Sequence, residues 1–148
     1  MKIQIDKILE ELKSLPWYDE QIALQGVQGQ TDPFYGIGKL SDIGYEETEF
    51  THPLFPSLEY TNQILFELKM CRTRVMKLYP GRCYSYHRDP SKRMHIPLIT
   101  NENCMFIIDD KVYRYPADGN SYLINTTKKH TAINASKEDR YHIVGCVY

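Results

Sequence analysis

His87 and Asp89 stand two residues apart in residues 83–98, which read CYSYHRDPSKRMHIPL. Side chains two apart on an extended strand point to the same face, so the imidazole and the carboxylate can aim at one point. Together they form two-thirds of a facial metal-binding triad, which a second histidine completes and which suits non-haem iron(II) oxygenases. The pattern is short, and a surface pair of histidine and aspartate would read the same. Arg93 and His95 form a second pair with the same spacing, expected on the next strand.

Two residues late in the chain can reach the same cavity. His130 opens the run HTAIN and Arg140 opens the run RYHIVGCVY, with the turn NASKED between them. If the two runs are antiparallel neighbours, both side chains face one cavity. A guanidinium in an apolar strand needs an anionic partner, and a carboxylate ligand fits its planar fork. The competing interpretation is an internal ion pair with Glu138 or Asp139.

The composition narrows the classes of protein. The chain has 148 residues, of which 42% are hydrophobic and 25% are charged, as in an ordinary soluble domain. The net charge of −1 gives no overall basic field for nucleic acid. No apolar run approaches the roughly 18 residues of a membrane span, so we expect no membrane partner. The charged N-terminus MKIQIDKILEELK is unlike a secretory signal.

The four cysteines are scattered through the chain and include no CxxC pair. This distribution argues against a structural zinc site and favours reduced thiols in a cytoplasmic protein.

The elements that must position these residues differ between the two halves of the chain. Apolar residues at helical spacing predict helices over residues 3–15, ended by Pro16, and 58–69, with Ser57 as the N-cap. Residues 17–30 look extended. Residues 31–57 are rich in Gly, Pro, Asp and Thr, which predicts a long irregular segment with one short strand, covering a site.

From residue 71 onward, short alternating or apolar runs are separated by turn residues. They predict strands at RVMKLY, CYSYH, MHIPLIT, CMFII, KVYRY, SYLIN, HTAIN and RYHIVGCVY. This spacing is typical of an all-β sandwich or barrel. We therefore expect one domain, 1–148, in which residues 1–70 support a β-rich core at residues 71–148.

The runs RVMKLYPGRCYSYHRD, KRMHIPLIT and HTAINASKEDRYHIV, in this order, resemble the core of the aspartyl/asparaginyl β-hydroxylase family of iron(II)/2-oxoglutarate dioxygenases. The resemblance covers residues 74–144. It implies a mainly β fold, a double-stranded β-helix or cupin-like jelly roll, with two supporting N-terminal helices. The N-terminal half does not match, so we expect substrate selection to reside there.

The resemblance also implies the reaction and its metal. His87, Asp89 and His130 would bind Fe(II) and leave three coordination positions free. The co-substrates would be 2-oxoglutarate and molecular oxygen. In the family reaction 2-oxoglutarate is oxidised to succinate and carbon dioxide while a C–H bond is hydroxylated. The substrate would be an amino-acid side chain, free or in a peptide or protein.

Three further residues receive roles from the resemblance. Arg140 would anchor the distal carboxylate of 2-oxoglutarate, and Arg93 and His95 would lie near its metal-bound end. The ligand imidazoles need hydrogen-bond partners to fix their orientation, for which the candidates are the side chains of Ser85, Asn125 and Asn134.

Other functions use the same residues. A cupin-like metal-binding protein or a non-oxygenase metalloenzyme would bind metal without 2-oxoglutarate. A binding module that acts through its interaction surfaces would keep the metal site only as an inactive relic. An oxygenase acting on a flipped nucleobase remains a minor alternative, which the net charge disfavours. The sequence leaves open the substrate, the stereochemistry and the oligomeric state.

Overall fold

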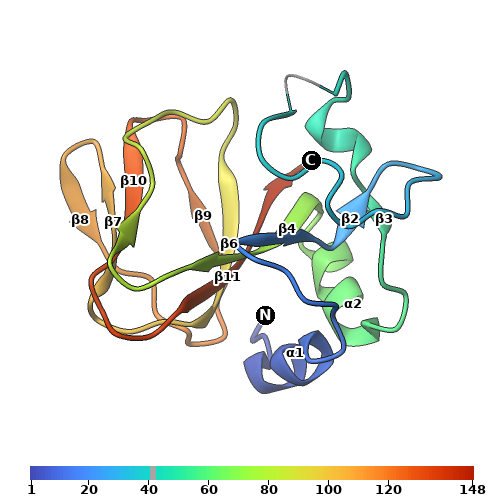
Figure 1. The fold of residues 1–148 in the computed structure, drawn as a ribbon, viewed down its shortest axis with the longest axis horizontal. Helices are drawn as coiled ribbons and strands as arrows, with labels where there is room; N and C mark the ends of the chain where they lie inside the picture. The colour runs from blue at the N-terminus through green and yellow to red at the C-terminus, as the bar shows by residue number, and fades with distance from the viewer. Residues whose placement is uncertain (41–42) are drawn as a thin grey trace.

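A computed structural model describes residues 1–40 and 43–148 (Figure 1). Most of the strands form two antiparallel sheets, and the two helices lie together on one side of them. No helix among the described residues is long and apolar enough to cross a bilayer.

The larger sheet has five strands in the order β1-β4-β11-β6-β9. Their bounds are β1 (Gln21–Ala23), β4 (Met70–Leu78), β11 (Arg140–Val147), β6 (Arg93–Ile99) and β9 (Tyr122–Ile124). The central strand β11 is buried along most of its length, because one face meets the helices and the other faces the second sheet. The edge strand β1 comes from the N-terminal segment, so this sheet extends beyond the β-rich half of the sequence.

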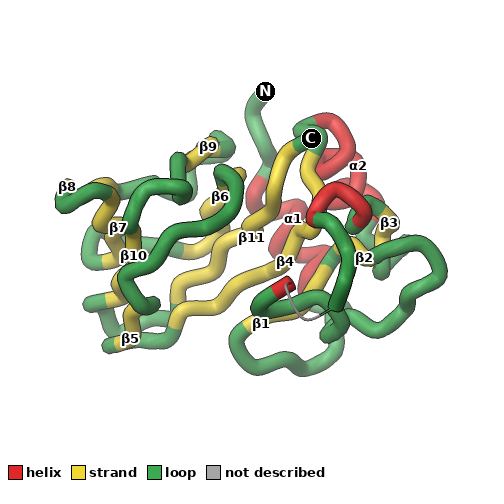
Figure 2. Tube along the Cα trace, turned by 90° about the horizontal axis from the view of Figure 1, so that it is seen from above, coloured by secondary structure: helices red, strands yellow, loops and turns green. Residues whose placement is uncertain are grey.

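The smaller sheet has four strands in the order β5-β10-β7-β8. Their bounds are β5 (Arg82–Cys83), β10 (His130–Asn134), β7 (Cys104–Ile108) and β8 (Lys111–Tyr113). The two sheets lie side by side in Figure 2, and apolar side chains fill the space between them: Leu78, Phe106, Ile108, Ile124 and Ala132. This arrangement is a jelly roll, which confirms the expected fold class.

The helices α1 (Ile5–Leu12) and α2 (Glu59–Glu67) cover the outer face of the larger sheet. Residues from both helices pack against this face in one apolar cluster, which includes Ile8, Leu65, Val75 and Ile143. Both helices are shorter than predicted.

The expected cap of α2 is wrong. Its N-cap is Leu58, which makes no side-chain hydrogen bond. Instead, the carboxylate of Glu11 in α1 accepts hydrogen bonds from the backbone N–H groups of Tyr60 and Thr61, at 2.9 and 2.8 Å. An acid from the neighbouring helix therefore satisfies the free donors at the start of α2.

The segment between the helices contains a short strand pair, as expected for an extended stretch at residues 17–30 and one short strand within residues 31–57. Strand β2 (Gln25–Gly26) pairs with β3 (His52–Pro53), and the 3₁₀ turn η2 (Glu47–Glu49) lies between them in sequence. The turn contacts β4 and β11, which brings residues of this segment to the larger sheet.

Strand β4 contains one extra residue relative to its neighbour. Cys71 lies opposite Cys146 and Arg74 lies opposite Val144, so β4 uses three steps where β11 uses two. The bulge includes Arg72, whose φ is 49°. The side chain of Gln25 spans the irregularity. It donates to the carbonyl of Met70 at 2.9 Å and accepts from the N–H of Thr73 at 3.1 Å.

Candidate metal centre

His87 and Asp89 lie in the coil that follows β5. The predicted strand over residues 83–87 is wrong, because the regular strand ends at Cys83. His87 forms one isolated antiparallel bridge with His130, with N–H to carbonyl distances of 3.0 and 2.9 Å. The N–H of Asp89 donates to the carbonyl of Thr126 at 2.8 Å. These backbone hydrogen bonds, rather than strand alternation, bring the residues together.

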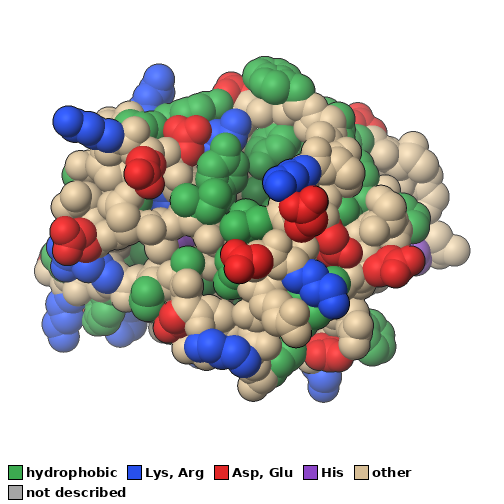
Figure 3. All heavy atoms as spheres, turned by 90° about the horizontal axis from the view of Figure 1, so that it is seen from below, with side chains coloured by type: hydrophobic (Ala, Val, Ile, Leu, Met, Phe, Trp, Pro, Cys, Tyr) green, Lys and Arg blue, Asp and Glu red, His purple; other side chains and the backbone are tan. Residues whose placement is uncertain are grey.

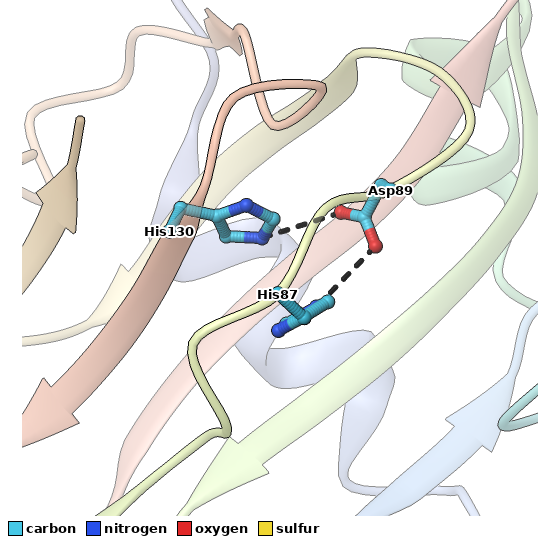
Figure 4. A group of neighbouring side chains, drawn as sticks. All are labelled: His87, Asp89 and His130. Carbon is cyan, nitrogen blue, oxygen red and sulfur yellow. Dashed lines mark ion pairs between the residues drawn. The ribbon is translucent and has the colours of Figure 1, made fainter.

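The three predicted ligands converge on one point (Figure 4). The carboxylate oxygens of Asp89 lie 3.4 Å from Nε2 of His87 and 3.4 Å from Nε2 of His130. The three ligand atoms all lie within 4.8 Å of one another, and this is the only such group found among the described residues. Ligands about 2 Å from a shared ion have similar separations. The two nitrogens and one carboxylate therefore fit a divalent metal of the non-haem iron type.

Backbone carbonyls orient both imidazoles. Nδ1 of His87 lies 2.6 Å from the carbonyl of Ser85, and Nδ1 of His130 lies 2.9 Å from that of Lys128. A carbonyl only accepts, so Nδ1 carries the hydrogen and the Nε2 lone pair of each neutral ring is available to a metal.

The expected side-chain partners of the imidazoles are therefore wrong. Ser85 contributes its carbonyl and not its hydroxyl. The amide of Asn134 donates to the carbonyls of Leu78 and Glu138 and not to either ligand histidine. The side chain of Asn125 accepts from Thr127.

Arg93 links the carboxylate of Asp89 to the N-terminal segment. Its Nη1 lies 2.9 Å from Glu47 Oε2, and its Nε lies 3.8 Å from Asp89 Oδ2. Burial alone would raise the pKa of Asp89, but the hydrogen bond that Nε2 of His130 donates when its ring is protonated and the charge of Arg93 outweigh burial and lower the pKa to about 2. Asp89 is therefore ionised at neutral pH. Burial also opposes the charged form of His130, yet its interactions with Asp89 raise the pKa of this histidine.

Arg140 lies in the same pocket as the triad. It is 2% exposed, and its Nε has no hydrogen-bond partner among the described residues. The alternative of an internal ion pair with Glu138 or Asp139 is wrong. No carboxylate among the described residues lies within ion-pair distance of Arg140. The guanidinium carbon lies 5.7 Å from the centre of the Phe106 ring.

His95 also faces this pocket, which has a volume of about 840 Å³. Its ring packs edge-on against Phe106, with 5.2 Å between the centroids. Burial and the nearby charges of Arg140 and Arg74 hold the pKa of His95 well below its usual value. His95 is therefore neutral at physiological pH.

The sequence patterns did not single out three residues that line the pocket. Arg72 and Arg74 lie on β4, and Glu47 lies in the turn η2. Two arginines so close together in a strand are a usable signal, because a sheet interior rarely accepts unpaired charges. Glu47 has no comparable signal, since its position depends on how residues 31–57 fold back onto the sheet.

Three solved structures, two of them described as cupin domains, are similar to part of the chain. A cupin domain from Bordetella pertussis has a TM-score of 0.45 and 17% identity, covering 52% of this chain and 80% of that one. The plu4264 protein of Photorhabdus luminescens has a TM-score of 0.43 and 17% identity, covering 51% and 61%. A cupin 2 conserved barrel domain protein from Salinispora arenicola has a TM-score of 0.42 and 13% identity, covering 51% and 61%. The matches span less than two thirds of the last two proteins.

A sequence model described as aspartyl/asparaginyl beta-hydroxylase matches residues 43–147. No curated protein sequence matches the chain. The matched region includes the whole triad, Arg140 and every strand of the jelly roll except β1. The chain therefore belongs to the aspartyl/asparaginyl β-hydroxylase family.

Proposed function

We propose that this protein is an iron(II)- and 2-oxoglutarate-dependent dioxygenase that hydroxylates an amino-acid side chain, free or within a peptide or protein. The observation that carries the proposal is Arg140, a buried guanidinium without an acidic partner among the described residues. It shares one pocket with the triad. A diacid bound to the metal at one end would offer its distal carboxylate to the planar fork of Arg140.

The three converging residues supply suitable ligands for iron. His87 and His130 would bind through Nε2, and Asp89 would bind through its carboxylate. A bound iron(II) would supply the electrons that activate dioxygen. The carbonyls of Ser85 and Lys128 hold the hydrogen on Nδ1 and orient the imidazoles, so that little rearrangement is needed on metal binding.

Arg93 and His95 would act at the metal-bound end of the co-substrate. Arg93 holds Asp89 in its ionised form and ties it to Glu47. His95 is neutral and buried, so it can contribute a hydrogen bond to an oxygen of the co-substrate without adding charge. Both residues pre-organise the pocket for an anionic ligand.

Substrate selection would fall to the segment that precedes the second helix. Residues 38–40 and 44–47 line the same pocket as the triad, alongside Gln21 of β1. This segment differs from the jelly-roll core in having little regular structure. Loops on a rigid scaffold are common carriers of specificity.

The test is co-substrate binding and turnover by the metal-loaded protein. We expect iron(II)-dependent formation of succinate from 2-oxoglutarate. The variant Arg140→Gln should bind 2-oxoglutarate at least about 100-fold more weakly, because a bidentate charge-assisted contact is lost. The matched control is Arg82→Gln, which removes an exposed arginine outside the pocket. Metal binding without any affinity of the parent protein for 2-oxoglutarate would contradict the proposal and favour a non-oxygenase cupin.

A nucleobase substrate has less support. On the face shown in Figure 3, basic and acidic side chains are interspersed. The net charge of the chain is −1. A strand of nucleic acid needs a continuous basic surface, so we favour an amino-acid substrate.

A cytoplasmic location is consistent with the thiols. All four cysteines are free, and three of them are buried. Free thiols persist in reducing compartments, and we therefore infer a cytoplasmic protein.

A further inference from the structure

Arg74 is a second buried guanidinium in the pocket without an acidic partner. It is 6% exposed, and it lines the same pocket as the triad. Its Nη1 donates to the side-chain oxygen of Gln21 at 3.3 Å, and its Nε has no hydrogen-bond partner in the part of the chain that the structure describes. Among the described residues no carboxylate lies within ion-pair distance of it. A buried guanidinium whose only hydrogen-bond partner is a neutral amide is unfavourable unless an anionic ligand pairs with its charge.

The bulge in β4 is what turns Arg74 towards the pocket. Cys71 and Arg74 both face the pocket side of the sheet, because they lie opposite Cys146 and Val144, two alternate residues of β11. If the same residues ran on from Cys71 in regular alternation, without a bulge, Arg74 would lie on the face that packs against the helices. The next residue, Val75, does lie in that helical core.

Arg74 and Arg140 serve different parts of the pocket. Arg140 lies opposite Leu78, and Leu78 is four residues along β4 from Arg74, which corresponds to about 13 Å. The pKa of Arg140 is lowered by burial, with Tyr84 as its main neighbouring influence. Burial likewise lowers the pKa of Arg74, to about 10.

The neighbours of Arg74 are the groups around the metal-binding carboxylate. Arg72 and Arg93 act with burial to lower its pKa, while Asp89 acts to raise it. Arg140 therefore enters the pocket beside Leu78, and Arg74 enters it beside Val144. The charges of both arginines act on the pKa values of Tyr84 and His95.

The charges in the pocket leave room for a second anion. Six basic side chains line the pocket against three acidic ones, Glu46, Glu47 and Asp89. Glu47 and Asp89 both contact Arg93. Arg72 donates to the carbonyls of Gly36 and Gly38, which carry no charge. A divalent metal and the dianion 2-oxoglutarate would cancel each other, so the excess positive charge would remain after both had bound.

We propose that Arg74 binds a carboxylate of the primary substrate, which is accordingly a free amino acid held by its α-carboxylate or a peptide held by an acidic side chain. The inference rests on the proposed function, because it takes the triad as the reaction centre and Arg140 as the co-substrate anchor. The pocket of about 840 Å³ lies near the upper end of the usual range for small-molecule sites, about 300–1,000 Å³. It can therefore hold a second molecule beside a five-carbon diacid.

The test compares ligands that differ in a single acid. Metal-loaded protein without oxygen is titrated, with and without 2-oxoglutarate, with free L-amino acids and their α-amides. A second arm uses N-acetylated, C-amidated peptides that contain either aspartate or asparagine. We expect one arm to show binding at least about 10-fold tighter for the acid than for its amide, and that arm identifies the source of the carboxylate.

Variants assign the effect to Arg74. Arg74→Gln should abolish the preference for the acid and change the affinity for 2-oxoglutarate by less than about twofold. Arg140→Gln should keep the preference for the acid and weaken the binding of 2-oxoglutarate. Arg82→Gln, at an exposed position outside the pocket, should change neither. Metal-free Arg74→Gln should also unfold at the same temperature as the parent or at a higher one, because it removes an unpaired buried charge.

Three results would overturn the inference. One is equal binding of acids and amides in both arms. Another is a loss of 2-oxoglutarate affinity in Arg74→Gln as large as that in Arg140→Gln, which would make Arg74 part of the co-substrate site. The third is a lowered unfolding temperature of Arg74→Gln, which would make Arg74 structural. Failure of the parent protein to bind 2-oxoglutarate, with the acid preference intact, would instead contradict the proposed function and leave the carboxylate site standing.

Discussion

His95 and His142 face each other through their Nδ1 atoms, which lie 3.1 Å apart between the neighbouring strands β6 and β11. Only one of the two nitrogens can carry the hydrogen. Nε2 of His142 is buried and has no partner among the described residues. A buried N–H without an acceptor is rarer than an unpaired acceptor. His142 therefore holds its hydrogen on Nδ1 and donates it to His95, which leaves His95 with a hydrogen on Nε2.

We predict this tautomer of His95 in solution. Nitrogen-15 NMR of the metal-free protein should show Nδ1 of His95 without a hydrogen and Nε2 with one. His142→Asn places an amide donor near the position of Nδ1 and should preserve the pattern. His142→Leu removes the donor and should give a mixture of the two tautomers. A hydrogen found on Nδ1 of His95 in the parent protein would contradict the prediction.

The same two histidines make the fold sensitive to acid. Burial and the charge of Arg140 hold the pKa values of His95 and His142 well below 6.5. The unfolded chain binds protons near pH 6.5 that the folded chain does not, so the free energy of unfolding falls as the pH drops below that value.

His142→Asn isolates half of this effect, because it keeps a polar group and removes one titrating site. Between about pH 6 and pH 5, its free energy of unfolding should fall less steeply than that of the parent, by about 1.4 kcal/mol per pH unit. Urea unfolding at a series of pH values gives both curves. Parallel curves for the two proteins would contradict the predicted buried neutral state of His142.

Removal of any one ligand should impair metal binding. His87→Ala, Asp89→Ala and His130→Ala each lose one donor of a three-residue site, and we expect each to lower the affinity for a divalent metal by at least about 100-fold. The matched control is His52→Ala, because His52 is an exposed histidine on β3. Calorimetric titration of the metal-free proteins checks the series. Unchanged affinity in His87→Ala and His130→Ala would remove the triad.

Glu11 should stabilise the packing of the two helices. Its carboxylate accepts three hydrogen bonds at the start of α2, two from backbone N–H groups and one from the Thr61 hydroxyl at 2.7 Å. Glu11→Ala should cost about 1–2 kcal/mol, as the loss of a helix cap does. Glu10→Ala removes an exposed pair with Lys13 and should change stability by less than about 0.5 kcal/mol.

This contribution of Glu11 should depend on pH. Burial tends to raise its pKa, but the hydrogen bonds from Thr61 and Tyr60 outweigh burial and lower it below 4.5. A lowered pKa in the folded state means that the stabilisation is present above about pH 4.5 and is lost as the pH falls through the folded value. Urea unfolding of the parent and Glu11→Ala should therefore converge in acid. A constant difference down to about pH 3 would contradict this account.

Local pattern was enough to predict some strands and not others. Strands β7 and β10 occupy the predicted residues 104–108 and 130–134, because each alternates or is apolar between clear turn residues. Strand β4 was predicted only from residue 74, although it begins at Met70. The bulge interrupts its alternation, and two arginines stand where an apolar run is expected.

The sequence likewise predicted some features of the site and not others. The family resemblance implied that His87, Asp89 and His130 form one cluster, and the three side chains do converge. The contact of Arg93 with Glu47 joins residues 46 positions apart through a loop of little regular structure. Such contacts depend on tertiary packing, which local periodicity does not encode.

The bulge spanned by Gln25 places a constraint on the length of β4 rather than on its composition. A substitution at Arg72 or Arg74 alters one side chain and leaves the register of the strand intact. Deletion of a single residue between Cys71 and Arg74 would remove the bulge and the contacts that Gln25 makes across it, while Arg74 would stay opposite Val144. Among homologous chains, this position should therefore vary in residue type long before it gains or loses a residue.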